Sequence, residues 1–193
     1  MVNEVHEKDL PTIMRRRPMA EATVAFLARL VNAQVIASKL TNFLVVVYRR
    51  LKIDPHIVAY ALCLLLTIRT TREGSLSSQN IKRYFFTSLL VAHNMLTDTP
   101  YDLPSWSLIV EESYSVDEIA LMEITYLGLI NWQTHVQNDD VTQMLVTLIR
   151  LYNTTLPPGG TIEVPIEFDK VSSDESLILS TIEYQPSTSS LVS

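Results

Sequence analysis

Apolar residues recur three and four positions apart through the middle of the chain, which is the spacing of a helix face and not of a strand. Only four glycines interrupt the chain, and two of them lie together at residues 159–160. The pattern predicts helices at about 18–37, 41–51, 55–68, 79–97, 104–110, 115–131 and 139–152. The sequence therefore predicts an all-α fold.

Two of these segments differ from an ordinary amphipathic helix. Residues 57–68 are apolar nearly all round, which indicates a helix enclosed by others. A membrane-associated protein built on this run and residues 43–48 is an alternative, but both runs are shorter than the roughly 20 residues that span a bilayer. Residues 41–51 are short and contain β-branched side chains, so a strand is an alternative there.

Several helix starts carry explicit signals. Ser115 and Glu118 form an S-x-x-E capping box, in which the two side chains satisfy each other's backbone donors. Ser77 or Ser78 is placed to cap the helix that runs to about residue 97. These signals predict where the helices begin more sharply than periodicity does.

The 193 residues suit one domain with two tails. We expect a flexible N-terminus over residues 1–17, a helical domain over 18–152 and a mostly disordered tail over 153–193. The tail contains Pro157-Pro158-Gly159-Gly160 and scattered Ser, Thr and Pro.

Composition and charge narrow the class of protein. The formal net charge is -6, and the one basic cluster, residues 15–17, is too small to argue for nucleic-acid binding. The single Cys63 lies in an apolar run, where a thiol behaves as a small buried hydrophobe in a reducing compartment. The first residues lack the features of a secretory signal, so we expect an intracellular protein of the cytoplasm, the nucleus or both.

The motifs of catalysis are missing from the sequence. It contains no G-x-x-x-x-G-K-[ST], G-x-G-x-x-G or G-x-S-x-G motif, and its four histidines are dispersed without the spacing of a metal site. We therefore expect no enzyme activity, cofactor, metal ion, nucleic acid, membrane or small-molecule substrate. The expected partner is another protein.

One charged residue breaks the pattern of the helix at 115–131. Val116, Ala120, Leu127 and Ile130 form its apolar stripe, and Glu123 lies on that stripe. A carboxylate that faces a core is costly unless it is paired. Glu123 is therefore expected to reach solvent at the edge or to have a specific partner, an arginine within the fold being one alternative.

Three segments of the chain resemble the cyclin box. Residues 81–92 (IKRYFFTSLLVA) and 121–132 (LMEITYLGLINW) are similar to box helices, and the second resembles the L-x-E-x-x-F-L-x-x-L-x-[WY] ending of P/U-type cyclins, which are fungal phosphate-system cyclins and their protozoan relatives. Residues 48–51 (YRRL) resemble the Y-L-x-R-L of the first box helix. The resemblance spans residues 40–137 and implies a single cyclin-box bundle of about five helices, with an extra N-terminal helix and a flexible C-terminal tail.

The resemblance also implies a binding surface for a kinase. Glu123 matches the glutamate of the fifth box helix, which meets the regulatory C-helix region of the kinase. Met95, Leu127 and Trp132 fall by position on the apolar kinase-facing surface, with plain core packing as the alternative for each. Arg50 is expected to brace the box internally.

The chain departs from the family at three places. Asn94 stands where the family has a lysine that pairs with the glutamate, and Thr67 stands where the second box helix has an aspartate. The Gly-Gly turn of P/U-type cyclins is replaced near residues 112–113. The expected function is that of a regulatory subunit that binds and activates a cyclin-dependent protein kinase. The alternative is a cyclin-fold scaffold or adaptor that binds a partner protein without activating a kinase.

Overall fold

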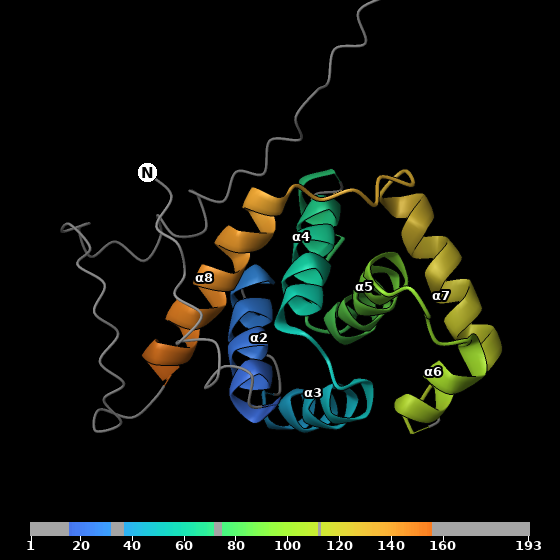
Figure 1. Ribbon diagram of the computed structural model, residues 1–193, viewed down its shortest axis with the longest axis horizontal. Coiled ribbons are helices and arrows are strands. Elements are labelled where there is room, and N and C mark those ends of the chain that lie inside the picture. The colour runs from blue at the N-terminus through green and yellow to red at the C-terminus, as the bar shows by residue number, and fades with distance from the viewer. Residues whose placement is uncertain (1–15, 32–36, 72–74, 112, 156–193) are drawn as a thin grey trace, which may run out of the picture. The chain divides into compact units, whose positions relative to one another are not determined.

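The computed structural model describes residues 16–31, 37–71, 75–111 and 113–155. Within these ranges the chain forms seven α-helices and no strand, so the prediction of an all-α fold is confirmed (Figure 1). The helices are α2 (Arg16–Leu30), α3 (Ala37–Leu51), α4 (Pro55–Thr71), α5 (Ile81–Leu96), α6 (Leu103–Ile109), α7 (Val116–Leu129) and α8 (Asn138–Thr155).

The termini of the chain lie mostly outside the described residues. Residues 1–15 and 156–193, which include most of both predicted tails, are not described. Helix α2 begins at Arg16 and α8 continues to Thr155, so both extend slightly beyond the predicted helical domain. No described helix is long and apolar enough to cross a membrane.

Helix α3 settles the ambiguity of residues 41–51. It begins at Ala37 and buries Leu44, Val47 and Tyr48, which follow helical spacing, so the strand alternative is wrong. Inside the fold, the Tyr48 hydroxyl donates a hydrogen bond to Thr23 Oγ1 of α2 at 3.1 Å. Burial raises the pKa of Tyr48. The phenol therefore acts as a neutral link between α2 and α3.

The start of α5 differs from its prediction. The residue before the helix is Asn80, and neither Ser77 nor Ser78 caps it with a side chain. The Asn80 amide instead folds the preceding loop, since Oδ1 accepts from the Ser77 backbone N–H at 2.8 Å and Nδ2 donates to the Ser75 carbonyl at 2.8 Å. Asparagine competes for local backbone groups in this way more readily than it extends a helix.

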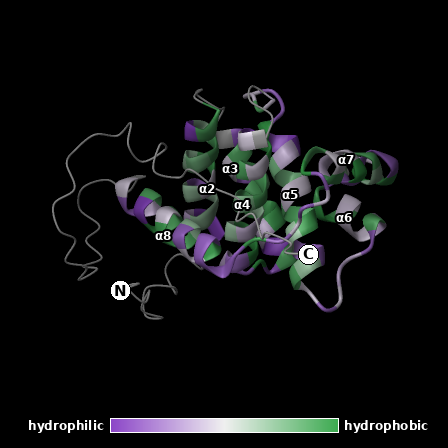
Figure 2. Ribbon diagram, turned by 90° about the horizontal axis from the view of Figure 1, so that it is seen from above, coloured by the Kyte–Doolittle hydropathy of each residue, from purple (hydrophilic) through white to green (hydrophobic). Residues whose placement is uncertain are grey.

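Helix α4 is the enclosed helix that the sequence predicted. Every residue from 58 to 68 is buried, and the helix packs against both α5 and α8. Figure 2 shows hydrophobic residues along it. Cys63 is buried in this helix, and burial raises the pKa of its thiol to about 12. The thiol is therefore un-ionised and packs as an apolar group, as expected.

The segment after α7 is hydrogen-bonded to Tyr60 of α4. The Tyr60 hydroxyl donates to the Thr134 carbonyl at 2.7 Å and accepts from the Val136 backbone N–H at 3.2 Å. The Tyr60 hydroxyl thus satisfies one backbone carbonyl and one backbone N–H of the segment between α7 and α8, which lies outside any helix. This link carries the chain from α7 to α8, which returns against α2 and α4.

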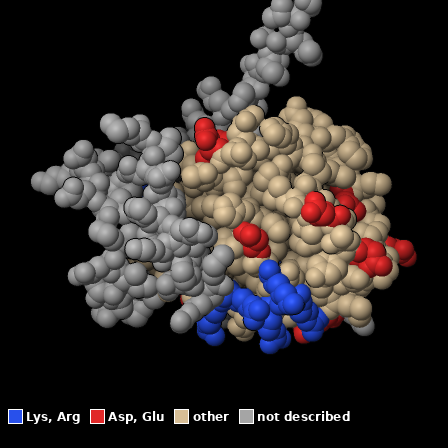
Figure 3. All heavy atoms as spheres, in the orientation of Figure 1, with Lys and Arg blue, Asp and Glu red and all other residues tan. Residues whose placement is uncertain are grey.

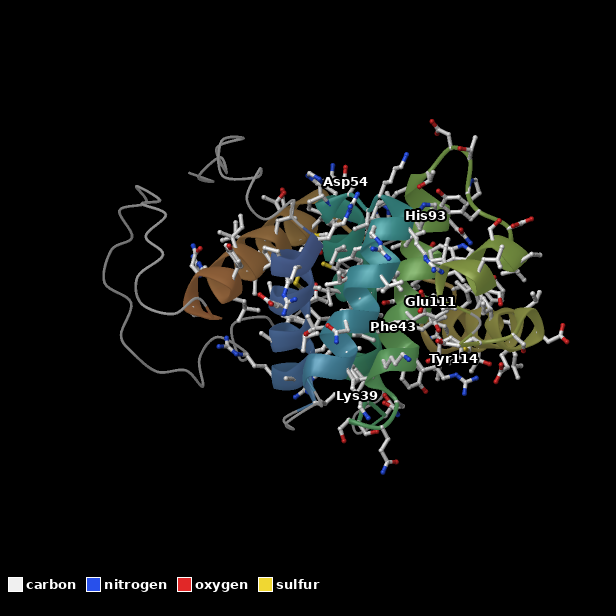
Figure 4. The ribbon with its side chains drawn as sticks, turned by 90° about the horizontal axis from the view of Figure 1, so that it is seen from below. Lys39, Phe43, Asp54, His93, Glu111 and Tyr114 are labelled. Carbon is white, nitrogen blue, oxygen red and sulfur yellow. The ribbon has the colours of Figure 1, made fainter. Side chains whose placement is uncertain are left out.

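An aromatic cluster joins α3, α5 and α6. The Phe86 ring stacks on Tyr114 at 5.5 Å between centroids and meets the edge of Trp106 at 5.8 Å. Lys82 Nζ lies 4.1 Å from the centroid of the Phe43 ring, and Phe43 and Tyr114 are labelled in Figure 4. Aromatic pairs and lysine–ring contacts at these distances contribute stabilisation in addition to that from burying apolar surface. The cluster therefore holds α5 against α3 and α6.

Candidate functional site

Helix α7 is fixed at both ends by its own sequence. At its start the predicted capping box is present, with Glu118 N–H donating to Ser115 Oγ and Ser115 N–H donating to Glu118 Oε2 at 2.8 Å. At its end the Trp132 N–H donates to the Leu127 carbonyl at 2.8 Å and the Asn131 N–H donates to the Gly128 carbonyl at 3.3 Å. This pair of bonds is the Schellman motif, with Asn131 in the left-handed conformation that the motif requires (φ 53°).

The buried side of α7 is rotated from the predicted stripe. Ile119, Met122, Tyr126 and Ile130 are buried, whereas Val116 is 38% exposed. Ala120 and Leu127 are half-buried at the boundary. The prediction was wrong because the helix is apolar on almost every side, so hydrophobic spacing alone does not select the side that packs. Glu123 consequently lies at the edge of the buried stripe and not at its centre.

Glu123 has a specific partner across the helix pair. Its Oε1 accepts a hydrogen bond from Asn94 Nδ2 at 3.2 Å, and both residues are half-buried. The sequence placed Asn94 and Glu123 together only through the resemblance, and the structure brings them into contact. Among the described residues Glu123 forms no ion pair, so its charge is met by an amide and not by an arginine.

The amide of Asn94 is itself only partly satisfied. Its Oδ1 is buried without a hydrogen-bond partner among the described residues. A lysine at this position would offer three donors and a positive charge, whereas asparagine offers two donors and no charge. The site therefore presents a carboxylate whose negative charge is not neutralised within the described fold.

Apolar side chains are exposed on the segments of the chain that carry this pair. Met95 is 51% exposed and Trp132 is 66% exposed, while Leu127 is half-buried one helical turn after Glu123. Plain core packing is therefore not the environment of Met95 or Trp132. We name six residues at the end of α5, on α7 and in the turn after α7 the α5–α7 face: Asn94, Met95, Glu123, Ile124, Leu127 and Trp132.

Sequence reasoning missed part of the exposed apolar surface. Ile124 is 63% exposed and follows Glu123 directly, and Leu121 is 61% exposed on the outer side of α7. Leu96 at the end of α5 is also exposed. In Figure 2, α7 is drawn hydrophobic over much of its length. The sequence signal that could have identified these exposed residues is the apolar character of residues 116–129 on nearly all sides of the helix.

The backbone of Trp132 is unusual for so large a residue. Its φ is 61°, directly after Asn131 at 53°, so two non-glycine residues in succession are left-handed. This conformation is unfavourable for a side chain that has a Cβ atom. The turn thus holds an indole ring at the end of α7, where it is mostly in solvent.

The carboxyl end of α5 rests on an aromatic support. His93 precedes Asn94, is buried, stacks on Tyr101 at 5.2 Å and meets the edge of Trp106 at 5.4 Å between centroids. Burial lowers the pKa of His93, which favours the neutral ring. The support fixes the direction in which Asn94 and Met95 leave the helix.

Two further residues singled out by the sequence lie away from the face. Arg50 of α3 donates to the carbonyls of Leu108 and Ile109 at the end of α6 and forms an ion pair with Glu111 at 2.8 Å. Thr67 is buried in α4 and donates to the Cys63 carbonyl of its own helix at 3.4 Å. Arg50 therefore links α3 to α6, and Thr67 faces the interior.

The charge of residues 84–149 is one-sided. No lysine or arginine occurs between Arg83 and Arg150, a stretch that contains most of α5, all of α6 and α7, and the first part of α8. The same stretch contains nine acidic residues: Asp98, Asp102, Glu111, Glu112, Asp117, Glu118, Glu123, Asp139 and Asp140. Figure 3 shows acidic side chains scattered where α5 and α7 lie, whereas basic ones gather at the lower edge, where α3 lies in Figure 1.

The arrangement is suited to binding another protein. The α5–α7 face exposes Met95 and Trp132, which are residue types enriched at protein interfaces. No group of three or more His, Cys, Asp or Glu side chains that could hold a metal ion occurs in the described ranges.

Comparison with known proteins identifies the family. The family described as Cyclin, N-terminal domain, matches residues 19–135, which is more than half of the chain and reaches from α2 to the segment after α7. The match therefore includes the helix that the sequence analysis had placed outside the box. No curated protein and no solved structure matches the chain. The cyclin domain is a regulatory module, and the chain belongs to the cyclin family.

Proposed function

We propose that this chain is the regulatory cyclin subunit of a cyclin-dependent protein kinase, which it binds and activates through the α5–α7 face. The observation that carries the proposal is the hydrogen bond between Asn94 and Glu123, which fixes a half-buried carboxylate, while Met95 on α5 and Trp132 at the end of α7 are exposed. Those two positions are the ones at which the resemblance expects the kinase contact. Membership of the cyclin family supports this assignment.

The proposed mechanism is a shift of populations in the kinase. The apolar side chains of the α5–α7 face bind the C-helix region of the kinase only when that helix is in its productive position. Because the face has higher affinity for this state, binding shifts the equilibrium toward it. The Lys–Glu pair that the kinase needs for phosphoryl transfer is then complete, and the chemistry belongs to the kinase.

The experiment is capture of the full-length chain with its partners from the cells of its source, followed by an assay of protein kinase activity. We expect an active kinase with the wild-type chain and its loss with Glu123→Ala or Trp132→Ala. Leu108→Ala is the matched control, because Leu108 is 63% exposed on α6 and outside the face. Unfolding of both test variants would instead make Glu123 and Trp132 structural residues.

A second candidate is a cyclin-fold scaffold or adaptor that binds a protein without activating a kinase. The observation that favours it is the uncharged Asn94 in place of a lysine, together with Thr67 in place of an aspartate. Stable partners without any kinase in the capture experiment would support this candidate.

We also propose an intracellular location and a place near the P/U-type cyclins. The location follows from a kinase partner and from the single cysteine, Cys63, which has no disulfide partner in the sequence. The subtype rests on residues 121–132 alone. Which kinase the capture experiment recovers would test both.

A further inference from the structure

We infer that the kinase subunit meets the α5–α7 face with a basic surface and places a lysine or arginine side chain against Glu123. This inference rests on the proposed function and specifies the chemistry of the partner. Three observations carry it: the uncompensated charge of Glu123, the incomplete hydrogen bonding of Asn94, and the absence of basic residues from this part of the sequence.

The first observation is the state of Glu123. Its carboxylate is half-buried and accepts one hydrogen bond, from a neutral amide, at 3.2 Å. An interface that covers this carboxylate removes its remaining water, and burying a charge without a partner is costly. A cationic donor from the other protein removes that cost and forms a charge-assisted hydrogen bond.

The second observation concerns what Asn94 can offer. In contrast to the lysine expected at this position, Asn94 brings no positive charge, and its Oδ1 acceptor has no partner among the described residues. The pair is therefore short of donors and not of acceptors. A partner that presented a carboxylate or backbone carbonyls here would meet repulsion.

The third observation is the field around the pair. The chain has no lysine or arginine between residues 83 and 150 and has nine acidic residues there. Glu111 is paired with Arg50 and Glu118 lies close to Arg83, so these two charges are partly compensated. The remaining acidic excess attracts a basic partner during diffusion and repels an acidic one. The local pair and the wider charge thus select the same kind of surface.

The test measures binding of the full-length chain to recombinant cyclin-dependent kinases of its source organism by calorimetry at 50, 150 and 300 mM KCl. Over this range the Debye length falls from above about 10 Å to below about 8 Å. For the kinase that binds, we expect affinity to fall about tenfold or more across this range, as for electrostatically steered complexes. Glu123→Gln keeps the shape and the acceptor of the side chain but removes its charge. We expect it to weaken binding by about tenfold at 50 mM and to flatten the salt dependence.

Asn94→Lys separates this inference from the expected family arrangement. A lysine at residue 94 would pair with Glu123 inside the chain and repel a cation from the kinase, so we expect weaker binding by about tenfold. Glu21→Gln is the control, because it makes the same chemical change on α2, and it should bind as the wild type does. Circular dichroism checks that all variants keep their helix content.

The outcomes distinguish the two proposals. If no kinase binds the wild-type chain, the proposed function fails and this inference fails with it. If a kinase binds but Asn94→Lys binds equally or more tightly, or if affinity does not change with salt, the proposed function stands and the basic partner surface is wrong.

Discussion

Helices α4 and α7 are both rich in apolar residues, yet the fold treats them in opposite ways. In α4 every residue from 58 to 68 is buried between neighbouring helices. In α7, Ile119, Met122 and Tyr126 are buried, whereas Leu121 and Ile124 are more than 60% exposed. The difference comes from their neighbours, because α4 lies between α5 and α8, whereas α7 lies at the edge of the bundle and has α5 and α6 on one side (Figure 1).

An apolar residue in these helices can serve packing inside the fold or binding of another molecule. Burial inside the described fold accounts for the composition of α4. It does not account for the outer side of α7, where apolar groups stay in water at a cost in free energy. Large exposed apolar side chains that gather on one element often mark a place where another molecule binds. The exposed half of α7 is therefore better explained by a partner than by folding.

The largest expected effect is on stability, and its absence would contradict the contrast between α4 and α7. Leu65→Ala in α4 should lower the free energy of unfolding by about 2–5 kcal/mol, because it leaves a cavity in a fully buried site. Leu121→Ala in α7 makes the same change at a site that is 61% exposed and should alter it by no more than about 0.5 kcal/mol. Urea unfolding of both variants measures the difference. Equal losses would mean that the outer side of α7 is packed in solution.

The next effect is on binding and concerns the end of α7. Trp132→Ala should weaken kinase binding by about 2 kcal/mol, since large aromatic anchors dominate interface energies. Its free energy of unfolding should stay within about 0.5 kcal/mol of the wild type, because the ring is 66% exposed. Calorimetric titration of the captured kinase and a urea curve give the two values. A loss of stability without a loss of affinity would make Trp132 a structural residue.

The two helices also show which features a sequence can predict. The enclosure of α4 and the capping box of α7 were predicted, because each depends on residues close together in the chain. The buried side of α7 was not predicted, because an apolar residue at nearly every position gives no direction to the helix. Only the packing of α5 and α6 against it decides that Ile119 is buried and Ile124 is exposed.

In the candidate site, too, features that depend on residues close together in the chain could be predicted, and those that depend on tertiary contacts could not. Glu123 stood out in the sequence as a charge among apolar residues, but its partner is 29 residues away in the chain and was reached only through family resemblance. The left-handed turn at Asn131 and Trp132 was not expected, since neither residue is a glycine. Contacts between distant elements and strained turns depend on tertiary structure and leave little trace in local patterns.

A smaller effect tests how α7 is held. Because α7 buries only one side, its capping box should matter to it more than a cap matters to α4. Ser115→Ala removes the acceptor of the Glu118 N–H and should lower the free energy of unfolding by about 1 kcal/mol. Ser113→Ala, at an exposed position two residues earlier, is the matched control and should have little effect. Hydrogen exchange should show faster opening of the first turn of α7 in Ser115→Ala alone.

The smallest expected effect is a pH dependence in α5, the helix that contacts both α4 and α7. Burial lowers the pKa of His93 in the folded protein, while the unfolded chain keeps a value near 6.5. Between the lowered pKa and about 6.5 the unfolded chain binds a proton that the folded protein does not, so the contribution of His93 is complete above this range and is lost as pH falls through it. Urea unfolding at pH 7.5 and 5.5 should show a loss of stability that is smaller in His93→Gln. The exposed His135 provides the control, since His135→Gln should keep the slope of the wild type. If His93→Gln and the wild type lose equal stability, the support beneath Asn94 admits a charged imidazole, and the end of α5 is as open to water as the outer side of α7.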